Sequence, residues 1–178
     1  MVYVLMAEGF EEIEAFTVVD ILRRAQIKTE LVSVDNKEYI KGAHGIAVKS
    51  DVYMRSIQSD YEMIFLPGGY PGYENLLKND AVKFLLTRAN NENKYITAIC
   101  AAPSILGKMG ILKGKTACCF PSFENELIGA NVVFDDVVCD NNIITSRGAG
   151  TAHKLAFKIV EILKGKDESE KLRNSMVY

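Results

Sequence analysis

Short apolar runs alternate with amphipathic stretches along most of the 178-residue chain. The runs are rich in Val, Ile, Leu and Met, as are strands that are buried on both faces of a sheet. Between the runs, apolar residues recur every three or four positions, which is the spacing of a helix with one buried face. We predict strands at 2–6, 29–34, 63–66, 95–99 and 143–146, and helices at 12–25, 81–91, 104–109 and about 151–163.

Weaker patterns predict a hairpin, three short strands and a terminal helix. Residues 38–49 alternate around Gly42 and Gly45, which is typical of a small hairpin. The charged run 164–173 is typical of a solvated helix. The short strands are expected near 116–119, 132–133 and 137–139.

The alternation of strands and helices predicts an α/β fold with a mostly parallel sheet covered on both faces. Ligands of such sheets bind beyond the carboxyl ends of the strands, where the strand order reverses. Three segments leave strand ends with unusual composition, namely 8–14, 67–69 and 99–101. We expect them to converge on one rim of the sheet and to form the functional site there.

Composition and charge limit the classes of partner. The chain is 48% hydrophobic, its formal net charge is −2 and its pI is about 5.8, so the charge gives no support for binding to nucleic acid or to an acidic membrane surface. No apolar stretch approaches the roughly 20 residues of a membrane span, and the first residues do not have the pattern of a signal peptide. We expect a single domain over residues 1–178, located in the cytoplasm.

Cys100 stands at a junction between a predicted strand and a predicted helix, in the stretch KYITAICAAPSILGKMG. A nucleophile on such a tight turn projects above the sheet edge, and the small Ala101 and Ala102 suit a crowded turn. Amides at the start of the helix are expected to lower the pKa of the thiol, and the amide of Ala101 to hold an oxyanion. The alternative is a small buried hydrophobic side chain, as most free cysteines are.

Two further segments complete the candidate site. Gly68 and Gly69 follow a strand in LPGGYPGYEN, where glycines permit a close approach of backbone amides to a ligand, or else form a plain turn. Glu11 and Glu12 are explained by the dipole of the following helix. Glu14 differs because it shares an apolar face of the helix, so we expect a raised pKa and a role in moving protons beside the thiol.

Other reactive side chains give weaker signals. We expect Cys118 and Cys119 to point to opposite faces of a strand, so that at most one is buried, and Cys139 to be exposed. The four cysteines have no metal-ligand spacing, so we expect free thiols and no metal. His153 is expected at the surface, His44 at the tip of the hairpin, and Arg147 either in an ion pair or lining the site.

Four segments together resemble the ThiJ/PfpI superfamily, and within it the branch of the Parkinson disease protein 7 and the bacterial YajL-like proteins. They are EGFEEIEA, LPGGYPGYENL, AICAAPSIL and IITSRGAGTAHKLAFKIVE, in this order. The resemblance runs from Val2 to about Gly165. It implies a flavodoxin-like three-layer sandwich with a cysteine nucleophile elbow, similar to class I glutamine amidotransferases, and a homodimer.

The resemblance also implies roles for individual residues. Cys100 falls on the reactive, oxidation-sensitive cysteine of the family and Glu14 on the glutamate that hydrogen-bonds to it. Gly69 and Ala101 fall on the positions whose amides face the thiol. Possible pocket or dimer contacts are Gly68, His44, Arg24 and Phe120.

Phe120 and His44 depart from the pattern of many relatives. Many of them carry a histidine where Phe120 stands, so the resemblance supports no Cys–His–acid triad here. His44 stands where a basic residue is usual near the dimer contact, and this change affects which anionic substrates are tolerated.

The expected function is a glyoxalase III or deglycase that needs neither glutathione nor a cofactor. Its substrates would be methylglyoxal, related dicarbonyls or their early adducts on amines, and its products lactate-type acids. The alternative is an oxidative-stress sensor or chaperone with an oxidisable Cys100 and no dedicated catalytic role.

Overall fold

A computed structural model describes all residues, 1–178. Seven strands form one sheet in the order β10-β11-β7-β6-β1-β2-β5, and every neighbouring pair is parallel except β10 with β11. Two small sheets pair β3 with β4 and β8 with β9. The strands are β1 (Val2–Met6), β2 (Thr29–Ser33), β3 (Tyr39–Lys41), β4 (Ala47–Lys49), β5 (Val52–Tyr53), β6 (Met63–Leu66), β7 (Tyr95–Ile99), β8 (Thr116–Ala117), β9 (Asn131–Val132), β10 (Val137–Asp140) and β11 (Ile143–Ser146).

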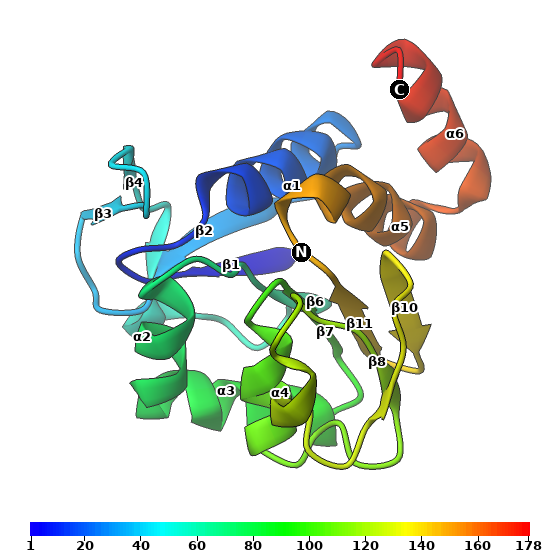
Figure 1. The fold of residues 1–178 in the computed structure, drawn as a ribbon. Helices are drawn as coiled ribbons and strands as arrows, with labels where there is room; N and C mark the ends of the chain where they lie inside the picture. Colours follow the sequence, from blue (N-terminus) through cyan, green and yellow to red (C-terminus); the bar gives the residue numbers. More distant parts are fainter.

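Helices cover both faces of the sheet, which gives the three layers of a flavodoxin-like sandwich (Figure 1). Helices α1 and α5 lie on one face, with α6 beyond them, and α2, α3 and α4 lie on the other. The predicted fold class is therefore confirmed. The helices are α1 (Glu12–Arg24), α2 (Gly72–Lys78), α3 (Asp80–Asn91), α4 (Pro103–Lys108), α5 (Ala152–Lys164) and α6 (Lys166–Ser175).

Alternating residues of β1 build the two halves of the core. Val2, Val4 and Met6 pack with α1 and α5, whereas Tyr3 and Leu5 pack with α2, α3 and α4. All five are at most 1% exposed, because successive side chains of a strand point to opposite faces and both faces are covered here. The core thus fixes the register of the central strand, and with it the position of the loop that follows.

The strand order reverses at β1. The chain passes from β1 to β2 on one side, and later returns to place β6 on the other side. The chain therefore continues from β1 to α1 on one face of the sheet and from β6 to α2 on the other, and the rim at these strand ends is where open α/β sheets bind their ligands. The amide of Glu11 in the loop after β1 donates to the carbonyl of Gly68 in the loop after β6 (3.0 Å), so the two loops meet at this rim.

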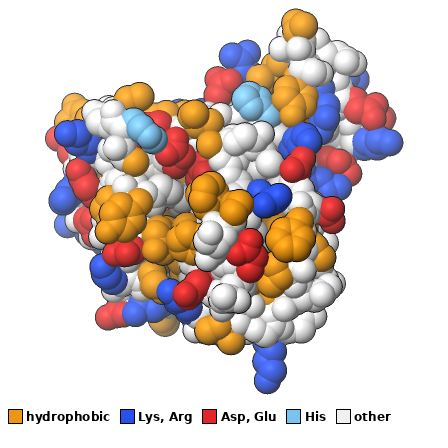
Figure 2. Space-filling view, in the orientation of Figure 1, with side chains coloured by type: hydrophobic (Ala, Val, Ile, Leu, Met, Phe, Trp, Pro, Cys, Tyr) orange, Lys and Arg blue, Asp and Glu red, His pale blue; other side chains and the backbone are white.

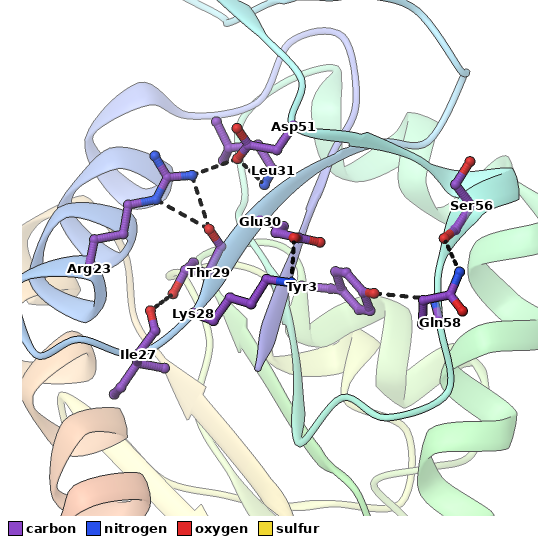
Figure 3. Close-up of polar contacts among 10 residues, drawn as sticks. All are labelled: Tyr3, Arg23, Ile27, Lys28, Thr29, Glu30, Leu31, Asp51, Ser56 and Gln58. Atoms are coloured by element: carbon purple, nitrogen blue, oxygen red, sulfur yellow. Dashed lines mark hydrogen bonds and ion pairs between the residues drawn. The ribbon is translucent and has the colours of Figure 1, made fainter.

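Polar contacts hold the far end of α1 to the sheet (Figure 3). The Arg23 guanidinium donates to the carbonyl of Thr29 (3.2 and 3.0 Å) and to the carboxylate of Asp51 (2.6 Å). Asp51 in turn accepts from the amide of Leu31 at 2.9 Å. These bonds join α1, β2 and the start of β5, and so they fix α1 at the end opposite to its first turn.

The observed elements match the predicted ones with two omissions. Strands 2–6, 63–66, 95–99 and 143–146 have the predicted bounds, and 38–49 forms the predicted antiparallel hairpin of β3 and β4. We missed β5 and α2. Strand β5 has only two residues, and α2 begins directly after Pro71 at Gly72, where the sequence favours a turn.

No helix combines the length and apolar character that a membrane crossing requires. On the face in Figure 2, basic and acidic side chains are interspersed, with hydrophobic side chains between them. That distribution agrees with the small net charge of the chain.

Candidate functional site

Cys100 lies at the carboxyl end of β7 with a left-handed backbone, φ 64°. Few residues other than glycine adopt this conformation, and it persists where surrounding bonds hold it. The Cys100 amide donates to the carbonyl of Ser146 (3.0 Å), and its carbonyl accepts from the amide of Phe120 (2.8 Å). Two neighbouring segments thus hold the thiol on a sharp turn between β7 and α4, as the sequence predicted.

Glu14 lies in the first turn of α1 and is only 1% exposed. Its Oε2 accepts from the amide of Gly68 at 2.8 Å, and its carboxyl group is hydrogen-bonded to the thiol of Cys100. Burial raises the pKa of Glu14 to about 7, although the two hydrogen bonds act in the opposite direction. The predicted raised pKa is therefore found, and its main cause is desolvation.

The thiol of Cys100 is half-buried and faces two backbone amides, those of Ala101 and Gly69. We expected such amides to lower its pKa, and they do act in that direction, but the net shift of the pKa is upward. Burial and the neighbouring Glu14 raise the pKa of the thiol, and the two amides offset only part of that rise. The thiol and the carboxyl group therefore act as a pair that loses one proton near pH 7 and the second only at a much higher pH.

Gly68 leaves no space between Cys100 and Glu14 for a side chain. A Cβ atom there would lie 2.7 Å from the Cβ of Cys100 and 2.8 Å from Oε2 of Glu14. Gly69 has φ +94°, and a Cβ atom there would lie 2.3 Å from the amide nitrogen of Glu11. Both glycines are thus required by the close contact of the loops that follow β1 and β6.

His44 lies at the hairpin tip and contacts the start of α1. Its Nδ1 lies 2.9 Å from Oε2 of Glu12 and 3.5 Å from Oε2 of Glu11, and its amide donates to Oε1 of Glu12 at 2.8 Å. Glu12 is 5% exposed, and it also accepts from the amide of Ile46 at 3.4 Å. Sequence analysis explained Glu12 by the helix dipole alone and missed this role, because the hairpin is over thirty residues away in the chain.

Phe120 lies at the site and Arg24 does not. The amide of Phe120 bonds to Cys100, and its ring is 45% exposed. Arg24 is at the last turn of α1, ten residues after Glu14 and hence roughly 15 Å along the helix. It is exposed and pairs with Asp20 at 2.6 Å, so it lines no pocket at the thiol.

The other cysteines lie outside this arrangement. Cys118 and Cys119 are 0% and 3% exposed, so the prediction that at most one is buried was wrong. The amide of Cys118 donates to the Thr145 hydroxyl (3.0 Å), and Cys119 packs in the core under α4, so both faces of this segment are covered. Cys139 is exposed, as predicted.

Arg147 lines a cavity of about 300 Å³ beside the loop that ends β11. It forms no ion pair, so the first of the two predicted roles is wrong, while a role in lining the site stays a prediction, because the lining of this cavity does not include Cys100 or Glu14. Phe120 lines the same cavity. The cavity thus borders the segments that hold the backbone of Cys100.

One group of side chains is close enough together to share a metal ion. The ligand atoms of Glu11, Glu12 and His44 all lie within 4.8 Å of one another. Glu12 is already occupied by hydrogen bonds from the hairpin, and the positive end of the α1 dipole disfavours a cation here. We therefore assign no metal to this group.

The structure is an α/β sandwich in which Cys100 lies on the turn after β7 and is hydrogen-bonded to the buried Glu14. The sequence model of the DJ-1/PfpI family matches residues 1–162, and the chain belongs to this family.

Relatives and solved structures match the chain over nearly its whole length. Protein dj-1beta of Drosophila melanogaster is 35% identical, over 98% of this chain and 95% of its own. The glutathione-independent glyoxalase DJR-1.2 of Caenorhabditis elegans is 32% identical, over 94% of this chain and 90% of its own. The structure of oxidized DJ-1 from Toxoplasma gondii has a TM-score of 0.95 at 32% identity, with 99% of this chain and 97% of that chain covered.

Proposed function

We propose that this protein is a glutathione-independent glyoxalase that converts methylglyoxal to lactate and acts on related dicarbonyls or their early adducts on amines. The observation that carries the proposal is the hydrogen-bonded pair of Cys100 and Glu14, which lies next to two backbone amides that face the thiol. A nucleophile, a proton carrier and an oxyanion site are the parts that this reaction needs. The similarity to DJR-1.2 of Caenorhabditis elegans supports the choice of reaction.

The first step forms a bond between sulfur and the aldehyde carbon. As Cys100 attacks, its proton passes to the ionised Glu14, and the carbonyl oxygen becomes negative. The amides of Gly69 and Ala101, which already face the thiol, stabilise that oxyanion. Glu14 then returns the proton to this oxygen, and the product is a neutral hemithioacetal.

The second step moves one hydrogen between the two substrate carbons. Glu14 removes the proton from the carbon bonded to sulfur and delivers it to the former ketone carbon, while the hydroxyl proton of the hemithioacetal passes to the former ketone oxygen, so the first carbon is oxidised and the second reduced. A thioester of lactate results. Water hydrolyses it to lactate and restores the thiol, and no external oxidant or cofactor takes part in this balance.

The test is lactate production from methylglyoxal without glutathione. Wild-type protein should form lactate, and Cys100→Ser should form none above the uncatalysed background, because the hydroxyl is a much weaker nucleophile. Cys139→Ser is the matched control: it removes an exposed thiol that lies on β10, and it should retain wild-type turnover. Equal lactate from wild type and Cys100→Ser would contradict the proposal.

The pH profile of kcat/KM should rise through about pH 7. The reaction needs the pair of Cys100 and Glu14 to have lost one proton, and the pKa of Glu14 is raised to about 7. His44 is a second titratable group near the start of α1, and its hydrogen bond with Glu12 raises its pKa above the ordinary value of 6.5, so His44→Gln is the control. The rising limb should persist in that variant, and a limb that stays near pH 4.5 in wild type would contradict the assignment of Glu14.

A second function, sensing of oxidants through the same thiol, is favoured by one observation. A similar structure is that of an oxidized DJ-1 from Toxoplasma gondii. The lactate experiment separates the two functions: an absence of lactate from the wild-type protein moves the assignment to redox sensing.

We also propose a homodimer. Ile13 of α1 and Ile46 and Tyr39 of the hairpin are 54%, 54% and 58% exposed, and they belong to elements that the Glu12 contacts hold together. An exposed apolar surface of this kind supports a contact with a second copy of the chain.

A further inference from the structure

Arg147 lies at the rim of the sheet, directly after β11, without a carboxylate partner. Arg23, Arg24 and Arg88 each form an ion pair with a carboxylate. Arg147 forms none, and its side chain makes no hydrogen bond, although the residue is half-buried. A half-buried guanidinium has lost part of its hydration, and it gains most from a partner that restores these hydrogen bonds.

The position of Arg147 relative to the nucleophile follows from the sheet register. Ser146 of β11 pairs with Ile99 of β7, and the amide of Cys100 bonds to the carbonyl of Ser146. Cys100 and Arg147 are therefore the next residues along two neighbouring strands, whose spacing is about 5 Å. A substrate attached to Cys100 would lie beside the segment that carries Arg147.

In the cavity beside this segment, the carboxylate that faces Arg147 is already paired with a lysine outside the lining. The charged lining residues are Arg147 and Asp136, and Lys154 pairs with Asp136. Burial raises the pKa values of Cys118 and Cys119, and the positive charge of Arg147 opposes this rise. The guanidinium is therefore near the two residues that precede Phe120 in the chain. The guanidinium lies 5.7 Å from the ring of Phe134, a stacking contact that orients it and leaves its N–H groups available.

We propose that Arg147 is a specificity-determining residue, which binds a carboxylate on the substrate while Cys100 reacts with the aldehyde. The preferred substrates are then 2-oxoaldehydes, or their adducts, that carry a carboxylate in addition to the two carbonyl groups. The reaction in this inference rests on the proposed function, whereas the binding of a carboxylate by Arg147 does not depend on it. A carboxylate fits because its two oxygens match the planar guanidinium, and the cavity has room for a short chain of carbons.

Alkylation of Cys100 tests the recognition independently of turnover. Iodoacetate and iodoacetamide react with the same thiol and have nearly the same size, but only iodoacetate carries a carboxylate. The ratio of their rates at Cys100, followed by mass spectrometry of its peptide, should fall about tenfold in Arg147→Gln, as expected for loss of one charge-assisted contact. Any change in the reactivity of the thiol itself cancels in this ratio.

Two variants separate geometry from charge. Arg147→Lys keeps the charge without the planar fork, and its ratio should lie between those of wild type and Arg147→Gln. Arg173→Gln is the matched control, because Arg173 also has no carboxylate partner but stacks on Phe157 and Tyr178 instead. An unchanged ratio in Arg147→Gln, or an equal fall in Arg173→Gln, overturns the proposal.

Turnover of two substrates then tests the specificity. Methylglyoxal is neutral, whereas 4,5-dioxopentanoate is a 2-oxoaldehyde with a terminal carboxylate, which the same reaction with one water converts to 2-hydroxyglutarate. The ratio of kcat/KM for 4,5-dioxopentanoate to that for methylglyoxal should fall about tenfold in Arg147→Gln, mainly through KM. If wild type turns over neither compound but its alkylation ratio depends on Arg147, the glyoxalase assignment fails and the recognition of the anion stands.

Discussion

Glu14→Gln should lose methylglyoxal turnover by about two orders of magnitude or more while it gains stability at alkaline pH. The loss follows because the amide cannot take the proton of Cys100 or move a proton between the substrate carbons, and such transfers contribute about 10²–10⁴ in rate. The side chain has nearly the same shape, and its oxygen can still accept from the amide of Gly68. The lactate assay measures this effect.

The gain in stability follows from the pKa of Glu14. Burial raises this pKa from its ordinary value of 4.5 to about 7, so the folded protein binds this proton more tightly than the unfolded chain. The free energy of unfolding therefore falls as pH rises from about 4.5 to 7, and stays lower above pH 7. At about 1.4 kcal/mol for each factor of ten in proton affinity, the raised pKa lowers the free energy of unfolding at pH 8 by about 3 kcal/mol. Glutamine carries no such charge, so Glu14→Gln should not show this loss of stability.

Urea unfolding of wild type and variant at pH 4 and pH 8 checks the sign. The two proteins should differ little at pH 4, where the carboxyl group is protonated in both states, and Glu14→Gln should be more stable at pH 8. Glu74→Gln is the control, because Glu74 forms an exposed pair with Lys78 whose loss changes stability by less than about 1 kcal/mol. A Glu14→Gln protein that is less stable at pH 8 than wild type would contradict the buried, ionised carboxyl group.

Gly68→Ala should reduce turnover at least about tenfold and destabilise the protein by about 1–3 kcal/mol. The added methyl group would lie 2.7 Å from the Cβ of Cys100 and 2.8 Å from Oε2 of Glu14, so the two must separate. Their hydrogen bond then lengthens, and the proton transfer that depends on it slows.

Two measurements check the Gly68→Ala prediction. Thermal unfolding should show a lower midpoint than wild type, and the lactate assay should show the lower rate at a temperature where the variant is folded. Circular dichroism at that temperature confirms the folded state. Wild-type turnover in a folded Gly68→Ala protein would show that the close contact of Cys100 and Glu14 is not needed.

The hydrophobic pattern was sufficient for the central strands because their apolar runs are continuous and end at clear breaks. Strand 63–66 ends at Pro67, and strand 95–99 ends at Cys100, and both have the predicted bounds. Helix α2 was missed because Gly72 and the preceding prolyl residue favour a turn, and the helix is held by packing of Leu76 against the core. Tertiary contacts decide such short elements, and one sequence does not contain them.

The candidate site was predicted in part for similar reasons. Glu14 was singled out by its apolar neighbours one and two turns along α1, a local signal that survives in the fold. The bonds of Cys100 to Ser146 and Phe120 join segments that are 20 to 46 residues apart, and they have no local signal. The direction of the thiol pKa was mispredicted because burial, which depends on the whole fold, outweighs the two nearby amides.

The left-handed backbone of Cys100 restricts which nucleophiles this fold can accept. A β-branched side chain is strongly disfavoured at φ 64°, so threonine is not an available replacement, whereas the unbranched side chains of cysteine and serine are tolerated at a cost in strain. The carbonyl group of the same residue is bound by the segment that contributes Phe120 to the Arg147 cavity. Substitutions in the loops can therefore change the substrate preference of this protein, whereas the backbone at residue 100 limits the nucleophile to an unbranched side chain.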